Sequence, residues 1–302
     1  MASARMKLLS IYLRRMRKPN LATPEAAIAH LSAPKGDPTP PRRIQNRFTV
    51  TRRSIDGFYC YTVQPKNITP TRTVVYVHGG SYVNEIVSPH WSFIAKLANS
   101  GCRVEVPIYG LAPIHEHHAA MQLVTAVYRD ILTQFAPNTI AIVGDSAGGG
   151  LALAVTQTLH GAGLLLPGKL VLISPWLDIT LSNPAIPLME HKDPWLNREP
   201  LTEFAHAWAN GTDLDTPALS PINGPLNDLP PIDLFIGTHD IVYPDALRLR
   251  ELAEQARTPI TLHVVEGGIH VYVLAPVPEG RAARRRIIES LAPFERNGRQ
   301  ER

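Results

Sequence analysis

A serine between small residues is the first place in this sequence where chemistry could occur. Residues 144–149 read Gly-Asp-Ser-Ala-Gly-Gly and contain the pattern G-x-S-x-G around Ser146. They follow the apolar run 140–143 and precede residues 151–159, whose pattern is typical of a helix. Small neighbours let the chain turn sharply between a strand and a helix, which keeps the hydroxyl exposed. The pattern therefore predicts a nucleophilic serine.

A glycine-rich turn that binds phosphate is the plainer alternative for the same residues. A P-loop would end in Gly-Lys followed by Ser or Thr, and the dinucleotide fingerprint would read G-x-G-x-x-G. Neither pattern occurs in residues 144–149. The run therefore favours a nucleophile over a phosphate site.

A second glycine motif follows the predicted buried strand 73–77, where His78 precedes Gly79 and Gly80. Acyl transfer passes through a tetrahedral oxyanion, which needs backbone N–H donors that no side chain obstructs. Glycines at the end of a strand meet this need, and the residue after the nucleophile, Ala147, supplies another N–H in this kind of turn. The pair also fits a simple tight turn, but its place one strand-helix-strand-helix-strand unit before the serine favours an oxyanion hole.

A nucleophilic serine needs a base, and the base needs an orienting carboxylate. Downstream, Asp240 follows the predicted strand 233–237, and His270 follows the predicted strand 260–266. The order serine, acid, histidine is the order that this motif predicts. His239 competes for the role of base, but adjacent residues of an extended chain direct their side chains apart.

A metal site is the alternative offered by the other histidines. His115, His117 and His118 lie together at a predicted helix start, with Glu116 as the local carboxylate. No cysteine lies near them, which argues against a zinc site. The sequence therefore predicts no metal and no organic cofactor.

The elements that must position these residues alternate along the chain. A hairpin with Asp56-Gly57 at its turn comes first. Strands and helices then alternate, which predicts an α/β fold with a mostly parallel eight-stranded sheet and helices on both faces. The predicted strands are 47–53, 58–64, 73–77, 103–107, 140–144, 169–173, 233–237 and 260–266, and the predicted helices are 88–99, 115–135, 147–160, 244–256 and 280–291.

Two segments fall outside the alternation. Residues 1–45 are rich in Pro and Ala, and residues 177–227 contain Pro, Asn and Trp. We expect both to form a cap, with residues 46–176 and 228–302 as the α/β core. Open α/β sheets bind ligands at the carboxyl ends of their strands, so the cap should roof that edge.

Composition indicates a globular enzyme domain, since the 302 residues are 44% hydrophobic and 19% charged. Only Cys60 and Cys102 occur, so we expect no disulfide framework and a cytoplasmic location. No run approaches the roughly 18 apolar residues of a membrane span, and residues 1–18 lack the cleavage site of a signal peptide. The sequence leaves the oligomeric state open, a homodimer included.

Positive charge gathers at the start of the chain. The first 53 residues hold 12 Lys and Arg against two acidic residues. Residues 4–18 fit a basic amphipathic helix that could contact an anionic membrane surface weakly. They also fit a lid helix whose apolar face, made of Met6, Leu9, Leu13 and Met16, packs over the active site. No recognition motif accompanies the charge, which argues against nucleic-acid binding.

Taken together, the motifs resemble the hormone-sensitive-lipase-like family of α/β-hydrolases, bacterial carboxylesterases with a His-Gly-Gly-Gly loop and a Gly-Asp-Ser-Ala-Gly-Gly turn. The resemblance runs from about residue 70 to about residue 290 and includes segments 109–113 and 172–178. It implies a catalytic triad of Ser146, Asp240 and His270. It implies an oxyanion hole of Gly79, Gly80 and Ala147.

This sequence departs from the family pattern in three places. Ser81 replaces the third glycine of the first loop. Residues 240–245 read Asp-Ile-Val-Tyr-Pro-Asp where the family has Asp-Pro-Leu-x-Asp-Glu, so Asp245 is a second candidate for the acid. His270 is followed by Val271-Tyr272 where the family often has Gly-Phe.

These residues predict a serine carboxylesterase that hydrolyses short- to medium-chain acyl esters, small-molecule substrates, through an acyl-enzyme. Hydrolysis of an arylformamide or another activated amide stays open, because the same triad and oxyanion hole serve both reactions. A non-catalytic small-molecule receptor is a further alternative, since the family includes plant hormone receptors that lost the triad histidine. His270 is present here.

Overall fold

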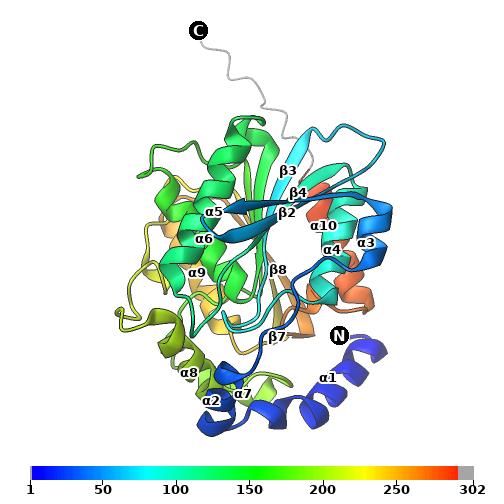
Figure 1. Ribbon diagram of the computed structural model, residues 1–302. Helices are drawn as coiled ribbons and strands as arrows, with labels where there is room; N and C mark the ends of the chain where they lie inside the picture. The colour runs from blue at the N-terminus through cyan, green and yellow to red at the C-terminus, as the bar shows by residue number, and fades with distance from the viewer. Residues whose placement is uncertain (1, 292–302) are drawn as a thin grey trace.

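One eight-stranded sheet forms the centre of the protein in the computed structural model, which describes residues 2–291 (Figure 1). The strand order is β1-β2-β4-β3-β5-β6-β7-β8. β2 runs antiparallel to both of its neighbours, and all other neighbouring strands are parallel. The strands are β1 Thr49–Ile55, β2 Phe58–Gln64, β3 Arg72–Val77, β4 Cys102–Ile108, β5 Ile140–Asp145, β6 Lys169–Ile173, β7 Ile232–His239 and β8 Ile260–Ile269. The predicted α/β fold with a mostly parallel eight-stranded sheet is confirmed.

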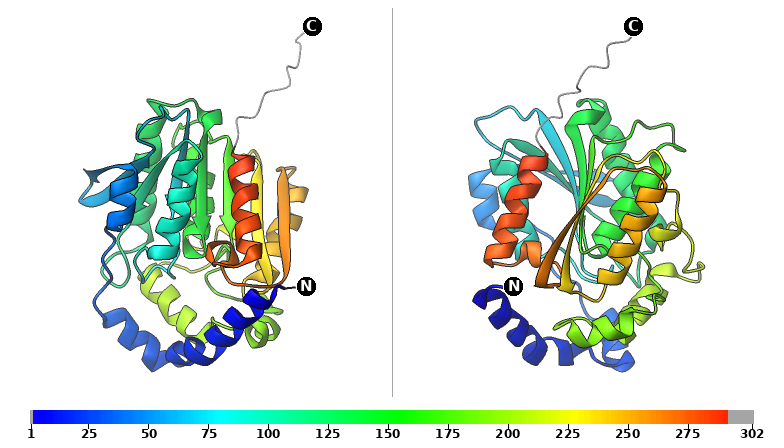
Figure 2. Two further views of the ribbon diagram at one scale, coloured as in Figure 1. Left: turned by 90° about the vertical axis from the view of Figure 1, so that its right-hand side faces the viewer. Right: turned by 180° about the vertical axis from the view of Figure 1, so that it is seen from behind.

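Helices cover both faces of the sheet (Figure 2). β5 and β6 are buried along their whole length, as expected for parallel strands between two helical layers. One apolar core lies under α5, α6 and α9, and the other lies under α4 and α10. The helices are α1 Ala4–Met16, α2 Pro24–Ser32, α3 Arg42–Arg47, α4 Ser88–Asn99, α5 His117–Leu132, α6 Ala147–Leu159, α7 Ile186–Lys192, α8 Arg198–Ala209, α9 Tyr243–Gln255 and α10 Pro278–Ser290. None of these described helices has both the length and the hydropathy to cross a bilayer.

The N-terminal segment and the insertion meet at one end of the molecule (Figures 1 and 2). There, α2 packs against α8. Two basic side chains, one in the last turn of α1 and one just after it, donate hydrogen bonds to backbone carbonyls of the insertion. One side-chain amide of the insertion donates to backbone carbonyls of the N-terminal segment. These bonds join Arg14 to the carbonyls of His191 and Lys192, Lys18 to those of Glu190 and Asp193, and Asn197 to those of Lys18 and Leu21.

Helix α1 differs from the expected lid. Met6 and Leu13 are buried, but they pack in the cluster that contains Tyr272 and Ile287, beside β8 and α10. Met16, expected on the same apolar face, is 58% exposed. It is the last residue of α1, after which the chain turns into a short 3-10 helix toward α2, so nothing packs over it.

Candidate active site

Ser146 lies on the tight turn between β5 and α6, as its motif predicts. Its φ is 52° and its ψ is −125°, a conformation that an L residue adopts only under strain. The turn is held by a hydrogen bond from the Ser146 N–H to the carbonyl of Ile173 at 2.8 Å. A Cβ on Gly144 would lie 2.3 Å from the Gly148 carbonyl oxygen, which explains the small residues on both sides.

Three side chains that are far apart in the sequence form one continuous hydrogen-bonded chain. His270 Nε2 lies 2.9 Å from Ser146 Oγ, and His270 Nδ1 lies 2.9 Å from Asp240 Oδ1. Asp240 is fully buried and His270 nearly so. When Nδ1–H donates to Asp240, Nε2 is left to accept the serine proton.

The charges around the three hydrogen-bonded side chains favour the protonated form of His270. Burial lowers the pKa of His270, but three carboxylates act in the opposite direction and hold the pKa above its ordinary value. Asp240 has the largest effect of the three, and Asp193 and Asp145 add to it.

The glycine loop after β3 lies directly against the serine turn. A Cβ on Gly79 would lie 2.5 Å from Asp145 Oδ2 and 2.9 Å from Ser146 Cβ, so only glycine fits there. Gly80 has a φ of +131°. Within residues 2–291 the N–H groups of Gly79 and Gly80 have no protein acceptor. Ala147 is the first residue of α6, where backbone N–H groups also lack helical partners.

This chain is similar to known hydrolases in both sequence and fold. The family described as the alpha/beta hydrolase fold matches residues 74–274. A crystal structure of an esterase from the bacterial hormone-sensitive lipase family aligns with a TM-score of 0.81 at 29% identity, covering 96% of this chain and 98% of that one. The chain belongs to the hormone-sensitive-lipase-like α/β-hydrolases.

Two curated relatives specify the kind of hydrolase. An acetyl-hydrolase of Streptomyces hygroscopicus is 35% identical over 216 residues, which is 70% of this chain and 72% of that protein. An esterase of Acinetobacter venetianus is 31% identical over 200 residues, 65% of this chain and 66% of that protein. Together with the fold, these similarities show that this hormone-sensitive-lipase-like protein is a carboxylic ester hydrolase.

The second acid candidate of the hydrolase lies elsewhere. Asp245 sits in the first turn of α9 and accepts a hydrogen bond from Asn183 Nδ2 at 2.8 Å. Burial raises its pKa to about 6. Asp240, not Asp245, contacts His270.

A buried network beneath Ser146 was not predicted from the sequence. Asp145 accepts from Tyr76 Oη at 2.7 Å and lies 3.2 Å from His90 Nε2. Burial alone would raise the pKa of Asp145, but His90 and the two hydrogen bonds hold it below its ordinary value. The signal available in the sequence was a carboxylate beside the serine, at the end of an otherwise apolar strand.

The insertion also reaches the site, which no motif indicated. The Trp195 ring lies edge-on to the His270 ring with centroids 6.0 Å apart. The neighbouring Asp193 is fully buried.

The histidines at the start of α5 give no metal site, since no group of three or more His, Cys, Asp or Glu in the described part of the chain is placed to hold an ion.

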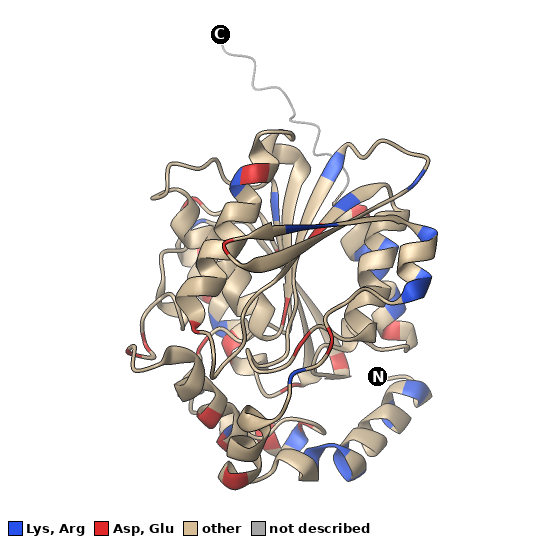
Figure 3. Ribbon diagram, viewed as in Figure 1, with Lys and Arg blue, Asp and Glu red and all other residues tan. Residues whose placement is uncertain are grey.

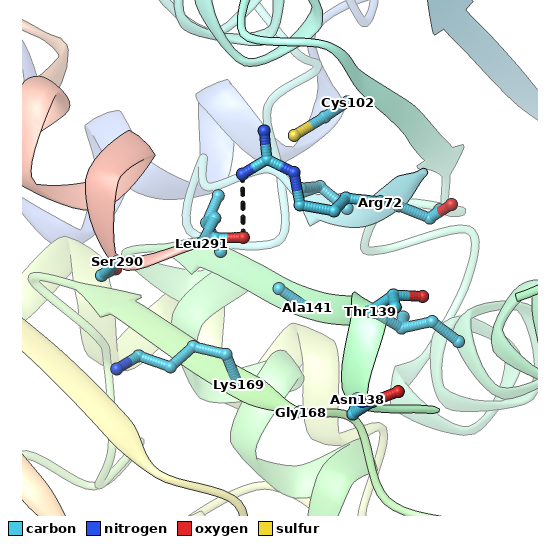
Figure 4. Close-up of a pocket in the computed structure, with 12 residues that line it drawn as sticks. Arg72, Cys102, Asn138, Thr139, Ala141, Gly168, Lys169, Ser290 and Leu291 are labelled. Carbon is cyan, nitrogen blue, oxygen red and sulfur yellow. Dashed lines mark hydrogen bonds between the residues drawn. The ribbon is translucent and has the colours of Figure 1, made fainter. Parts of the chain in front are cut away.

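A small cavity at the opposite edge of the sheet is not a substrate site (Figure 4). It lies where β3, β4, β5 and β6 begin, and Arg72 donates to the Leu291 carbonyl across it at 3.0 Å. Its volume of about 20 Å³ has room for about one water molecule.

Gly79→Ala is expected to lower kcat by about 10²- to 10³-fold, because the added Cβ must push the loop away from Ser146 and displace its N–H donors. Steady-state kinetics on a small ester measures the loss. Gly161→Ala is the matched control, since its Cβ would meet only the Thr158 carbonyl at an ordinary 3.6 Å. Equal activity of the two variants would contradict the placement of this loop.

Proposed function

We propose that this hydrolase cleaves short- to medium-chain acyl esters in two steps, with Ser146 as the nucleophile. The hydrogen-bonded chain from Ser146 through His270 to Asp240 carries the proposal. In the first step His270 Nε2 takes the proton of Ser146 Oγ as the oxygen attacks the acyl carbonyl. The N–H groups of Gly79, Gly80 and Ala147 stabilise the resulting oxyanion.

Collapse of the tetrahedral intermediate breaks the ester bond. His270 returns the proton to the leaving alcohol, and the acyl group stays on Ser146. A water molecule then gives a proton to His270 and attacks the acyl carbonyl, which releases the carboxylic acid and restores the serine hydroxyl. Asp240 keeps the imidazole in the required tautomer throughout, and no metal or organic cofactor takes part.

The preference for short acyl groups has two supports. One is similarity to the protein named acetyl-hydrolase. The other is the filled space beside the oxyanion loop, where the rings of Tyr82 and Trp208 stack with centroids 4.5 Å apart and Trp176 lies against Tyr82. All three side chains are buried, so they form a closed wall.

We also propose that residues 1–45 and 177–227 together roof the site. His30 of α2 bonds through Nε2 to Asn84 Oδ1 at 2.7 Å, and Asn84 in turn donates to the Gly80 carbonyl. Trp195 of the insertion covers His270. The insertion thus contacts His270 directly, and residues 1–45 reach the oxyanion loop through Asn84.

A reducing cytoplasm is proposed as the working location. Cys60 and Cys102 are both free and buried. Burial raises the pKa of the Cys60 thiol well above its ordinary value, so the thiol resists oxidation.

A substrate series tests the proposed function. Purified protein would be assayed with nitrophenyl esters of increasing acyl length and with an arylformamide. The proposal expects the highest kcat/KM on a short or medium ester. A higher kcat/KM on the arylformamide than on any ester would indicate an amide hydrolase instead. Tight binding of a ligand without turnover would indicate a receptor.

A further inference from the structure

The cap insertion places a buried carboxylate directly behind the proposed triad acid. Asp193 lies in the turn between α7 and α8 and is fully buried. Its Oδ2 accepts the backbone N–H of Ile241 at 2.9 Å, and Ile241 is the residue that follows Asp240. Its Oδ1 accepts the N–H groups of Trp195 and Leu196 at 2.7 and 2.9 Å. One side chain therefore ties the cap turn to the acid loop.

The acid loop also has bonds of its own, and the Asp240 carbonyl accepts the Tyr243 N–H at 3.0 Å. Asp240 Oδ1 binds His270 and accepts the Val242 N–H at 3.2 Å. Asp240 Oδ2 is buried and has no hydrogen-bond partner among the described residues. The donor to Asp193 exists because Ile241 stands where the family pattern has proline, which lacks an N–H.

We propose that Asp193 is a positioning residue for the triad, which fixes the backbone behind Asp240 and adds a negative charge that favours the protonated form of His270. This inference rests on the proposed function. The same turn carries Trp195, so it both anchors the acid loop and shields the imidazole from water.

Charges around the two groups give the direction of the effect. His270 faces Asp240 after β7, Asp193 in the cap and Asp145 at the end of β5, and all three raise its pKa. Asp193 faces Asp240 and His270, and Lys18 binds its backbone carbonyl. Burial, followed by the Asp240 charge, raises the pKa of Asp193 to about 6.

Asp193→Asn is expected to shift the acid limb of the kcat/KM profile to lower pH. Loss of the anion lowers the pKa of His270, so the neutral base persists to lower pH. Activity at the acid end, relative to the optimum, should rise several-fold. Asp193→Glu keeps the charge but not the geometry, so it should keep the acid limb and lower kcat by about 10- to 100-fold.

Asp178→Asn is the matched control. Asp178 is a buried carboxylate of the same insertion, but it accepts hydrogen bonds from Thr180 and Ser182 of its own loop. The acid limb of the kcat/KM profile of Asp178→Asn should stay at the wild-type position. An unchanged limb in Asp193→Asn, with only a lower melting temperature, would show a merely structural role. That result would leave the proposed function intact, whereas an active Ser146→Ala variant would overturn both.

Helix α1 carries a second, independent feature, an exposed face that combines apolar and basic side chains. Leu8, Tyr12 and Met16 follow one another at helical spacing and are 67%, 50% and 58% exposed. Arg5 and Arg15 lie on the same side of the helix and are also exposed. A different side of the helix, with Met6 and Leu13, packs on the protein.

The charge on this helix is of one sign. Its 13 residues include four Lys or Arg and no Asp or Glu. In Figure 3 all charged residues of α1 are basic, and the helix lies at the end of the molecule that carries α2, α7 and α8. A protein partner would match the apolar residues equally well, but a helix with this charge and these side chains suits the interface of an anionic bilayer.

We propose that the exposed face of α1 binds an anionic lipid surface. Leu8, Tyr12 and Met16 would enter the headgroup boundary, while Arg5 and Arg15 contact lipid phosphates. The proposal requires no change in α1, because its other face is already packed.

Cosedimentation with vesicles tests this surface. Binding is expected to vesicles that contain phosphatidylglycerol and not to vesicles of phosphatidylcholine alone, and it should weaken in high salt. Arg5→Gln and Arg15→Gln should each reduce the partition coefficient by roughly fivefold. The pair Leu8→Ser and Tyr12→Ser should reduce it by about tenfold or more.

Ile114→Ser with Leu165→Ser is the control, since these side chains are 78% and 68% exposed and do not belong to α1. Their partition coefficient should equal that of the wild type. Equal loss in the control, or no binding to anionic vesicles, would overturn the proposal. A dimer in solution that Leu8→Ser and Tyr12→Ser dissociate would show that a second copy covers this face instead.

Discussion

Replacing Ser146 with alanine is expected to lower kcat by about 10⁶-fold, the loss found where a triad of this kind has been dissected. Within the described residues the hydroxyl bonds only His270, so its removal deletes the nucleophile and disturbs little else. The backbone turn is held by the bond to Ile173, which alanine retains. The variant should therefore fold normally.

Nitrophenyl ester hydrolysis and a thermal melt measure these two outcomes. Ser92→Ala on α4 is the control, because its hydroxyl donates to the Ser88 carbonyl and accepts from Arg43, both outside the candidate site. It should keep wild-type kinetics. A Ser146→Ala enzyme that retained more than about a hundredth of the wild-type kcat would show that the nucleophile is misassigned.

Asp240→Asn is expected to lower kcat by about 10⁴-fold, because an amide facing His270 Nδ1 favours the wrong imidazole tautomer. The fold should survive, since asparagine has the same shape. Kinetics at several pH values would separate this loss from a shift in the pH optimum.

Asp245→Asn is the matched comparison. It removes a second buried carboxylate, which lies in the first turn of α9, just after the loop that carries Asp240. Asparagine can still accept the bond from Asn183, and the lost interaction with the helix dipole is worth about 1 kcal/mol or less. Its kcat should stay near the wild-type value. Loss of activity in Asp245→Asn together with an active Asp240→Asn would reverse the assignment of the acid.

The sheet and the meeting of Ser146, Asp240 and His270 could be predicted because their signals are local. Buried parallel strands read as short apolar runs, and each candidate residue follows such a run. The strands end at one edge of the sheet, so residues that follow them must meet. The predicted strand 47–53 began too early, because residues 42–47 form α3 before β1.

Contacts made by the cap could not be predicted in the same way. Asp193 and Trp195 belong to an insertion without a motif, and their approach to Ile241 and His270 depends on how that insertion folds back over the sheet. The exposure of Met16 likewise depends on where the chain turns after α1. Amphipathic spacing shows which faces a helix has, but not which face meets the protein.

The bonds between the two cap segments bear on how this enzyme could be redesigned. Arg14 and Lys18 donate to backbone carbonyls of residues 190–193, and every residue type carries a carbonyl there. The insertion can therefore accept new side chains at residues 190–192 without losing its attachment, whereas the Asp193 side chain has bonds of its own to Ile241, Trp195 and Leu196. The two basic residues cannot vary as freely. Libraries aimed at new substrates should diversify the rest of the insertion and hold Arg14, Lys18 and Asp193 constant.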